Sequence, residues 1–368
     1  MPRHATTVSL GPAIADSDAA VPRPVREDSK GGPLAVFPLR RGDRVGRYRV
    51  RDRLGHGGMG VVFSAIDPEL GRRVALKLVR HRAGERPDPR HTARLRREAR
   101  ALARLNHPNV VHLYDLGSTA RGIFLAMEFI EGKSLTAWMN ERERTPAEVL
   151  AAYRQAGRGL AAAHRAGIIH RDFKPTNVII DPRGHVTVVD FGLARGIERE
   201  ESAADDSDVD WAVLTERLTK RNVILGTKGF MAPEQLLALD VTPAADQFSF
   251  CVSLFEALYL MRPYPGTNAV ETAKAFAIGK MVEPPPKKGV PKYVLRALQR
   301  GLAIEPEKRF PSMDELLRAL SPRTERRRRR RLAAALFATA SLSAALGSWA
   351  SGDRPAPTQV CVSESPVP

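Results

Sequence analysis

The chain has 368 residues, of which 43% are hydrophobic, so it is long enough to bury one large core or two ordinary ones. Its formal net charge of +17 suits nucleic acid, an anionic membrane or acidic substrates as a partner. Its two cysteines, Cys251 and Cys361, are too few for a disulfide framework or a cysteine metal cage.

The first 46 residues differ in composition from the rest of the chain. Residues 1–46 are rich in Pro, Ala, Gly and Arg and lack the uninterrupted apolar stretch of a signal peptide. Such a composition buries too little apolar surface to offset the entropy of the chain. The sequence therefore predicts a disordered leader over residues 1–46.

A strand-rich region extends from residue 47 to about 130. Alternating or β-branched runs predict strands, and a run with helical spacing over 90–105 predicts one helix that ends before Asn106-His107-Pro108. The predicted strands cover 48–55, 61–67, 72–79, 110–117 and 122–130. We expect a small sheet accompanied by one helix.

The chain then becomes mainly helical, from about residue 131 to 320. Thr145-Pro146 is typical of a helix start, and 145–167 is predicted to be one long helix. The run 246–260 is apolar all round, which indicates a buried helix. Helices are also predicted over 291–302 and 312–320. The fold class is α+β, with a β-rich lobe, a larger helical lobe and a cleft between them.

A basic block and an uncharged run close the sequence. Residues 321–331 are arginine-rich and end in six consecutive arginines, and 332–350 carry no charge. The run is long enough for a transmembrane helix. An amphipathic surface helix would need a charged face, and a buried helix would need more chain to cover it. Arginines on the N-terminal side place the preceding residues in the cytoplasm, so 351–368 form a short tail outside it. This arrangement favours an anionic membrane over nucleic acid, for which no usual motif occurs.

The stretch 54–62, "LGHGGMGVV", is a candidate phosphate-binding loop. Gly55, Gly57 and Gly60 form G-x-G-x-x-G, which alone also fits a dinucleotide-binding loop. A dinucleotide loop opens into a helix, whereas a β-branched strand follows here, and Lys77 comes next. Glycines let a hairpin approach phosphates, and a neighbouring lysine can hold them. The predicted contacts are Leu54, Gly55, His56, Gly57, Gly58, Met59, Gly60, Val61, Val62 and Lys77.

A lysine in a cleft needs an anion to hold it. Glu98, on the predicted helix over 90–105, is the natural partner, and we expect a structural Lys77–Glu98 ion pair. The alternative is that Glu98 pairs with a neighbour on its own helix, Arg94 or Arg97.

The stretch 168–177, "IIHRDFKPTN", gathers groups suited to phosphoryl transfer. Asp172 can take or orient the proton of an attacking hydroxyl, and Lys174 can balance the charge of the phosphoryl group. Asn177 and Asp190 offer the oxygen ligands that Mg²⁺ prefers beside phosphate oxygens. Arg171 has no obvious local partner, so we expect its partner to be an anion from elsewhere in the chain.

Taken in order, these motifs resemble those of the protein kinases, and more closely the bacterial eukaryotic-like (Hanks-type) serine/threonine kinases. The resemblance covers about residues 48–320. The matching residues are Gly55-x-Gly57-x-x-Gly60-x-Val62, Ala75-Leu76-Lys77, Glu98, His170-Arg171-Asp172, Lys174, Asn177, Asp190-Phe191-Gly192 and Ala232-Pro233-Glu234.

The resemblance implies an ATP-dependent kinase of Ser/Thr hydroxyls on proteins, using Mg²⁺ with Mn²⁺ as a substitute. Beyond the glycine loop it implies that adenine meets Ala75, the gatekeeper Met127, and the hinge from Glu128 to Ile130. Lys174 and Thr227 match the Ser/Thr class rather than the tyrosine class.

The resemblance also assigns structural roles. It implies that Leu102, Leu113, His170 and Phe191 stack in an apolar spine, that Asp246 anchors the catalytic loop, and that Glu234 pairs with Arg309. Two alternatives remain, a catalytically silent scaffold at the membrane and an aminoglycoside phosphotransferase. The second would lack the Ala-Pro-Glu platform and the threonine at 227.

The stretch between Asp190 and Glu234 is a candidate regulatory segment. Residues 198–210 carry seven acids and one arginine, so they form either a solvated loop or an anion that docks on the arginine-rich helix or on Arg171. Arg171 beside the base is typical of kinases that are activated by phosphorylation. The resemblance favours Thr219 as the site, modified in trans by a second copy, with a homodimer as one route; Thr215, Ser202 and Ser207 are weaker candidates.

Overall fold

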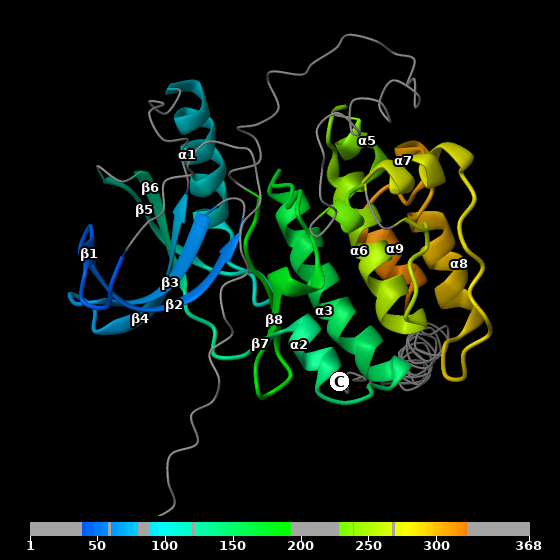
Figure 1. The fold of residues 1–368 in the computed structure, drawn as a ribbon, viewed down its shortest axis with the longest axis horizontal. Helices are drawn as coiled ribbons and strands as arrows, with labels where there is room; N and C mark the ends of the chain where they lie inside the picture. Colours follow the sequence, from blue (N-terminus) through cyan, green and yellow to red (C-terminus); the bar gives the residue numbers. More distant parts are fainter. Residues whose placement is uncertain are drawn as a thin grey trace, which may run out of the picture.

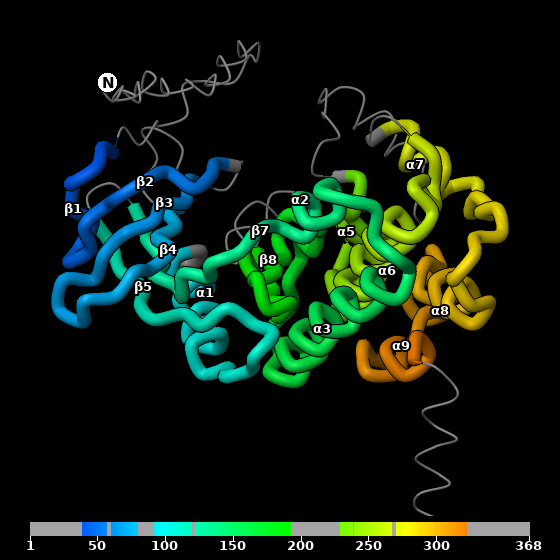
Figure 2. Tube along the Cα trace, turned by 90° about the horizontal axis from the view of Figure 1, so that it is seen from below, coloured from blue at the N-terminus to red at the C-terminus, as the bar shows by residue number. Residues whose placement is uncertain are grey.

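The computed structural model describes residues 39–57, 60–79, 89–119, 122–192, 228–237, 239–266 and 269–321. In this part of the chain a sheet-rich lobe lies beside a helical lobe, as the sequence predicts (Figure 1). The same division is visible from below in Figure 2. Residues 332–350, the predicted transmembrane run, lie outside the described residues. No helix within the described residues is long and apolar enough to cross a membrane.

The first lobe is built on a six-stranded antiparallel sheet. Its order is β1-β2-β3-β4-β6-β5. The strands are β1 (Arg44–Val45), β2 (Tyr48–Gly57), β3 (Gly60–Asp67), β4 (Arg72–Val79), β5 (Leu113–Thr119) and β6 (Gly122–Glu128). The predicted leader boundary at 46 is too late, because β1 pairs with β2 and Leu39 packs against the core of this lobe.

One helix, α1 (Pro89–Arg104), lies against the sheet and contacts β5 (Figure 1). Leu95, Ala99 and Leu102 are buried, at the i, i+4 and i+7 positions that form one helix face. The strand β5 begins later than the predicted start at 110, because Val110 forms an isolated parallel bridge with Val188 instead.

The second lobe is helical. Its helices are α2 (Leu135–Asn140), α3 (Pro146–Arg165), α5 (Pro233–Leu236), α6 (Pro243–Tyr259), α7 (Ala269–Ile278), α8 (Lys292–Gly301) and α9 (Met313–Ala319). Thr145 caps α3 as predicted, in a reciprocal capping box with Glu148. The helix α6 begins at Pro243, before the predicted start, and is buried over most of its length.

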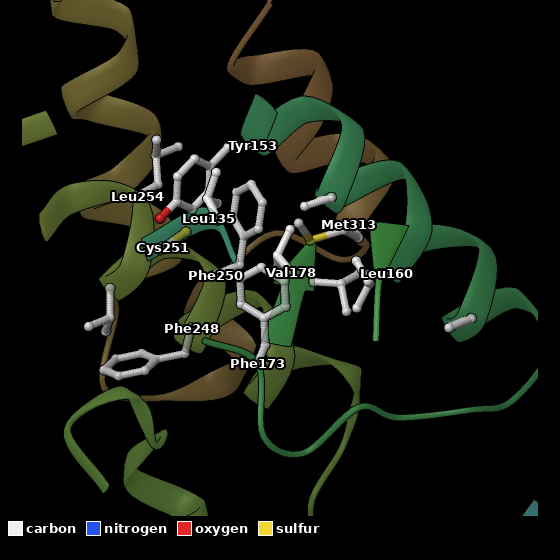
Figure 3. Close-up of a cluster of buried hydrophobic side chains, with 14 of the residues drawn as sticks. Leu135, Tyr153, Leu160, Phe173, Val178, Phe248, Phe250, Cys251, Leu254 and Met313 are labelled. Atoms are coloured by element: carbon white, nitrogen blue, oxygen red, sulfur yellow. The ribbon is translucent and has the colours of Figure 1, made fainter. Parts of the chain in front are cut away.

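The core of the helical lobe is aromatic. Figure 3 shows Tyr153 of α3, Phe250 of α6 and Phe173 of the loop 168–177 gathered in one cluster. The ring of Phe250 lies 5.6 Å from that of Tyr153 and 5.6 Å from that of Phe173. Because Phe173 directly follows Asp172, this packing fixes the loop that carries the candidate base to the most buried helix of the lobe.

A small three-stranded sheet positions the end of the loop 168–177 and Asp190. It consists of β7 (Lys133–Ser134), β8 (Val178–Ile180) and β9 (Val186–Val188), in that order. The loop 168–177 runs directly into β8, and Asp190 comes shortly after β9. Because β8 and β9 pair antiparallel, the end of this loop and Asp190 are brought to the same edge of the sheet.

Candidate active site

The register of β3, β4 and β6 determines which side chains of the first lobe face the cleft. Lys77 on β4 lies between Val62 on β3 and Leu125 on β6, and Ala75 pairs with Met127. Side chains directly opposite one another in antiparallel strands share a face. The predicted nucleotide contacts Val62, Ala75, Lys77 and Met127 therefore lie on one face of the sheet.

Alternation along β3 puts Val61 on the other face. Val61 packs in the core cluster of the first lobe with Phe63 and Leu76, whereas Val62 faces Lys77. Only the backbone of Val61 is therefore placed to approach a nucleotide. His56 pairs with Val61 in the register and lies on the same face as Val61.

The glycine hairpin closes between Gly57 and Gly60, which pair across β2 and β3. Gly60 has φ +153°, and a Cβ at that position would lie 2.0 Å from the carbonyl oxygen of Leu78. Any other residue would push the hairpin off β4, which explains the glycine here. Gly58 and Met59, at the tip, lie outside the described residues, and Leu54 before the hairpin is 48% exposed.

Lys77 forms an ion pair with Asp190, not with Glu98. The prediction of a Lys77–Glu98 pair is therefore wrong for this structure. Lys77 is 4% exposed, and its Nζ contacts Oδ1 of Asp190 directly. Burial raises the pKa of Asp190, but the charge of Lys77 and its hydrogen bond outweigh burial, so the pKa of Asp190 is lowered. Asp190 is thus held as a carboxylate.

Glu98 instead binds two arginines. Its Oε1 accepts from Nη1 of Arg171 at 3.0 Å and from Nε of Arg94 at 3.3 Å. The alternative of a pair with Arg94 on the same helix is confirmed. The expectation that Arg171 meets an anion from elsewhere in the chain is also confirmed, since Glu98 is on α1.

The loop with the candidate base is held by many hydrogen bonds. The carboxylate of Asp246 on α6 accepts from the backbone N–H groups of His170 and Arg171, each at 2.7 Å. The predicted anchoring role of Asp246 is confirmed. Arg171 has φ +63°, a conformation that is costly for a non-glycine residue, and these bonds fix it there.

Asp172 lies at the centre of the loop. Lys174 Nζ donates to Oδ2 of Asp172 at 2.9 Å, and Asn177 Nδ2 donates to its carbonyl oxygen at 2.9 Å and to Oδ2 at 3.3 Å. The sequence prediction that these three residues converge is confirmed. Because Asn177 uses Nδ2 on Asp172, its amide oxygen is the atom that can bind a cation.

Asn177 and Asp190 fit a magnesium ion. The backbone N–H of Val189 donates to the carbonyl oxygen of Asn177 at 2.9 Å, which brings Asp190 beside Asn177. A carboxylate and an amide oxygen are the hard donors that Mg²⁺ takes, with phosphate and water oxygens completing its shell. Within the described part of the chain no cluster of three or more His, Cys, Asp or Glu side chains forms a metal site by itself.

His170 is structural and neutral. Its Nδ1 accepts from the N–H of Asp172 at 3.2 Å and its Nε2 donates to the carbonyl oxygen of Val189 at 3.0 Å. Burial lowers the pKa of His170, and nearby acids such as Asp246 only partly oppose this. The ring also lies 4.7 Å from that of Phe191, as the predicted spine requires. Leu102 and Leu113 belong with Phe191 to one buried cluster.

Two residues that were not predicted, Gln235 and His164, help to hold the loop 168–177 in place. Gln235 Nε2 donates to the carbonyl oxygen of Arg171 at 2.9 Å, and His164 Nε2 lies 2.8 Å from Oδ2 of Asp246. Gln235 could have been singled out in the sequence because it directly follows Ala232-Pro233-Glu234. The predicted Glu234–Arg309 pair is confirmed, with bonds of 2.7 and 2.9 Å. Thr219 and Thr227 lie outside the described residues.

A two-lobed fold with a glycine hairpin, a buried lysine and a loop that presents Asp172, Lys174 and Asn177 defines a phosphotransferase of the kinase type. Residues 48–319 match the protein kinase domain, and the chain belongs to that family. The match confirms the resemblance seen in the sequence.

Curated relatives carry serine/threonine kinase names. The chain is 34% identical over 275 residues to the serine/threonine-protein kinase PknA of Mycobacterium tuberculosis, a match that covers 73% of this chain and 59% of PknA. It is 39% identical over 229 residues to PknL of the same organism, covering 62% of this chain and 53% of PknL. The chain thus spans little more than half the length of these relatives.

Solved structures share the fold. The kinase domain of PknI from Mycobacterium tuberculosis matches with a TM-score of 0.55 and 24% identity, covering 77% of this chain and 97% of that domain. The predicted two-lobed kinase fold is confirmed.

Proposed function

We propose that the protein is a serine/threonine protein kinase that transfers the γ-phosphoryl group of ATP to hydroxyl groups of protein substrates. The observation that carries the proposal is the hydrogen-bonded group of Asp172, Lys174 and Asn177, placed beside Asp190 and Lys77. Family membership and the names of the relatives support the same reaction and the Ser/Thr class.

Each residue then has one task in the transfer. The acceptor oxygen forms a bond to the γ-phosphorus, the bond from that phosphorus to the β,γ-bridging oxygen breaks, and ADP leaves. Asp172 takes the hydroxyl proton, and Lys174 and Lys77 balance the charge on the phosphate oxygens. Mg²⁺, or Mn²⁺ in its place, would be held by Asp190 and Asn177 and would neutralise phosphate charge.

Labelled ATP with myelin basic protein as a generic acceptor tests the proposal. The wild-type chain should label the acceptor, and Asp172→Asn should lower the rate by about 10²- to 10⁴-fold, because a general base is lost. Asp314→Asn is the matched control, since Asp314 is exposed on α9 and pairs with Arg165. Absence of labelling by the wild-type chain with Mg²⁺ or Mn²⁺ present would favour the silent scaffold.

We also propose that the enzyme is switched on by phosphorylation of the segment before Glu234. Arg171 binds Glu98 in this structure, and Lys77 binds Asp190. A phosphate adds about −1.5 to −2 charges and can replace a carboxylate on an arginine. A phosphate near Arg171 would release Glu98 toward Lys77, and Lys77 would then release Asp190 to bind metal.

Mass spectrometry after incubation with ATP tests this regulation. Thr219 should carry phosphate, and Thr219→Ala should be less active than Thr215→Ala. If a second copy performs the reaction, the initial rate of autophosphorylation should rise with the square of the protein concentration. A fully active chain without phosphate on residues 202–227 would contradict the proposal.

We further propose that residues 332–350 tether the kinase domain to the bacterial cytoplasmic membrane, with that domain in the cytoplasm. The support is the absence of charge over this run and the arginine block before it. The full chain expressed in bacteria should sediment with membranes and resist extraction by high salt. A chain that carries several added aspartates within 332–350 should be released. Equal release of both chains would contradict the tether.

A further inference from the structure

The proposed transfer requires the carboxylate of Asp172 to point at the acceptor hydroxyl. That direction depends on the peptide group between Arg171 and Asp172, because this planar group sets where the side chain of Asp172 leaves the backbone. The N–H of the group donates to Nδ1 of His170 at 3.2 Å, and its carbonyl oxygen accepts from Nε2 of Gln235 at 2.9 Å. Both sides of the peptide group are therefore held, one of them by Gln235.

The anchor from α6 does not reach this peptide group. Asp246 binds the N–H groups of His170 and Arg171, each at 2.7 Å, and so fixes the two peptide groups that come before it. The φ of Arg171 is +63°, where a non-glycine residue is strained, so the next peptide group also needs to be held. Gln235 binds it at the point that Asp246 leaves free to turn.

The side-chain amide of Gln235 is itself held in one orientation. Its Oε1 accepts from the backbone N–H of Ala232 at 3.2 Å, while its Nε2 donates to the carbonyl oxygen of Arg171. A backbone N–H only donates and a carbonyl oxygen only accepts, so a reversed amide would lose both bonds. Glutamine supplies the acceptor and the donor together, whereas an ionised glutamate at this position would have no hydrogen to donate.

The backbone that carries Gln235 is anchored as well. Gln235 lies on α5, directly after Glu234, whose buried carboxylate accepts from Arg309 at 2.7 and 2.9 Å. A donor on a rigid support holds its partner more precisely than a donor on a mobile one. The bond from Gln235 therefore links the catalytic loop to a firmly held part of the helical lobe.

A purely structural role is the alternative. It accounts for the bond to Ala232, because a glutamine at the third position of a helix commonly binds the backbone N–H of the residue that caps it. It does not account for the bond to Arg171, which leaves α5 and ends on the residue directly before the base. The second bond therefore indicates a task in the catalytic loop.

We propose that Gln235 is a positioning residue for the phosphoryl transfer: its amide holds the peptide group between Arg171 and Asp172 and, through it, the carboxylate that takes the hydroxyl proton. The proposal rests on the proposed function, because it needs Asp172 to be the base. Gln235 has no contact with nucleotide, metal or acceptor in this scheme. Loss of its donor should therefore slow the transfer and leave ATP binding unchanged.

Kinetics of the full-length protein with ATP and myelin basic protein test the proposal. Gln235→Glu keeps the size and the acceptor but loses the donor, and Gln235→Met loses both. Each should lower kcat by about 10- to 100-fold, as expected when a buried acceptor is left without its donor. The affinity for ATP in calorimetry should stay within about twofold, because a positioning role adds nothing to nucleotide binding.

Gln299→Glu is the matched control for the added charge. Gln299 is exposed on α8, and the substitution is the same as at position 235. Its kcat should equal that of the wild type.

A double variant separates positioning from general damage. Gln235→Glu is combined with Asp172→Asn, which removes the base and leaves a slow residual transfer that labelled ATP can follow. If Gln235 acts through the carboxylate of Asp172, the double variant should be no more than about threefold slower than Asp172→Asn alone. Damage that does not depend on Asp172 would lower the rate by the same factor in both backgrounds.

Three results would overturn the inference. An unchanged kcat in both Gln235 variants means that the bond to Arg171 does not position the base. An equal loss in the wild-type and Asp172→Asn backgrounds means that Gln235 does not act through the carboxylate. A loss of kcat that comes with a similar loss of ATP affinity leaves Gln235 with a structural role. A wild-type chain that does not label myelin basic protein would instead refute the proposed function.

Discussion

Loss of the Arg309 side chain should strongly lower the free energy of unfolding of the helical lobe. It is 1% exposed, and its guanidinium group is fully used. Nη1 and Nη2 each donate to one carboxylate oxygen of Glu234, and they also donate to the carbonyl oxygens of Ala244 and Ile304. Nε donates to the carbonyl oxygen of Ala303 at 2.8 Å.

The substitution Arg309→Met keeps most of the volume and removes every one of these bonds. Glu234 is 4% exposed, so its carboxylate would remain buried without its partner. Breaking one side of a buried pair costs about 3–5 kcal/mol, whereas the whole free energy of unfolding of a domain is about 5–15 kcal/mol. We expect Arg309→Met to remove about a fifth or more of the free energy of unfolding.

Urea unfolding of the full chain, followed by tryptophan fluorescence, measures the effect. Arg318→Met is the matched control, because Arg318 pairs with Glu315 on the surface of α9 and is 60% exposed. That change should cost less than about 1 kcal/mol. If the two variants unfold at the same urea concentration, the reasoning about the buried pair is wrong.

Three further predictions concern the site and its supports. Lys77→Met should weaken ATP binding by about 10- to 100-fold in calorimetry, because a charged hydrogen bond to phosphate is worth about 1.5–3 kcal/mol; unchanged affinity would contradict the placement of Lys77. Burial lowers the pKa of His170 in the folded protein, whereas the pKa of an unfolded histidine is about 6.5. As the pH falls below about 6.5, the unfolded chain binds a proton at this position before the folded chain does, so the free energy of unfolding decreases. His170→Phe should therefore unfold with a weaker pH dependence between about pH 7 and pH 5 than the wild type. Gly159→Ala should lower the melting temperature although alanine favours helices, since its Cβ would lie 2.3 Å from the carbonyl oxygen of Asn109; a higher melting temperature would contradict the close approach of α3 to that loop.

The sequence predicted the long elements and the chemistry of the loop well. Strands β2, β3 and β4 and helices α1 and α3 carry clear periodicity, and the residues of 168–177 are ordered by short-range bonds. Strands β7 to β9 and helix α2 were missed because elements of two to six residues leave too short a pattern. Helix α7 was missed as well, although a run of alanines with interspersed apolar residues was present.

The partners of Lys77 and Glu98 could not be derived from the sequence. Glu98 has Arg94 four residues before it and Arg171 across the cleft. Spacing along the chain does not show which of these cations, or Lys77, the carboxylate of Glu98 will bind. Their energies differ by little, because every pairing exchanges one charged hydrogen bond for another. Only the position of α1 relative to the loop decides which cation the carboxylate meets.

The two ion pairs across the cleft depend on each other. Lys77 and Arg171 are the cations, and Asp190 and Glu98 are the anions. Metal bound at Asp190 would remove the partner of Lys77, and Glu98 is the carboxylate that α1 could offer in its place. Since Glu98 can leave Arg171 at low cost only when another anion replaces it, nucleotide binding in the cleft and anion binding at Arg171 should favour each other. By thermodynamic reciprocity, a phosphate at Arg171 must then raise the affinity for metal-bound nucleotide by the same factor by which that nucleotide favours the phosphate.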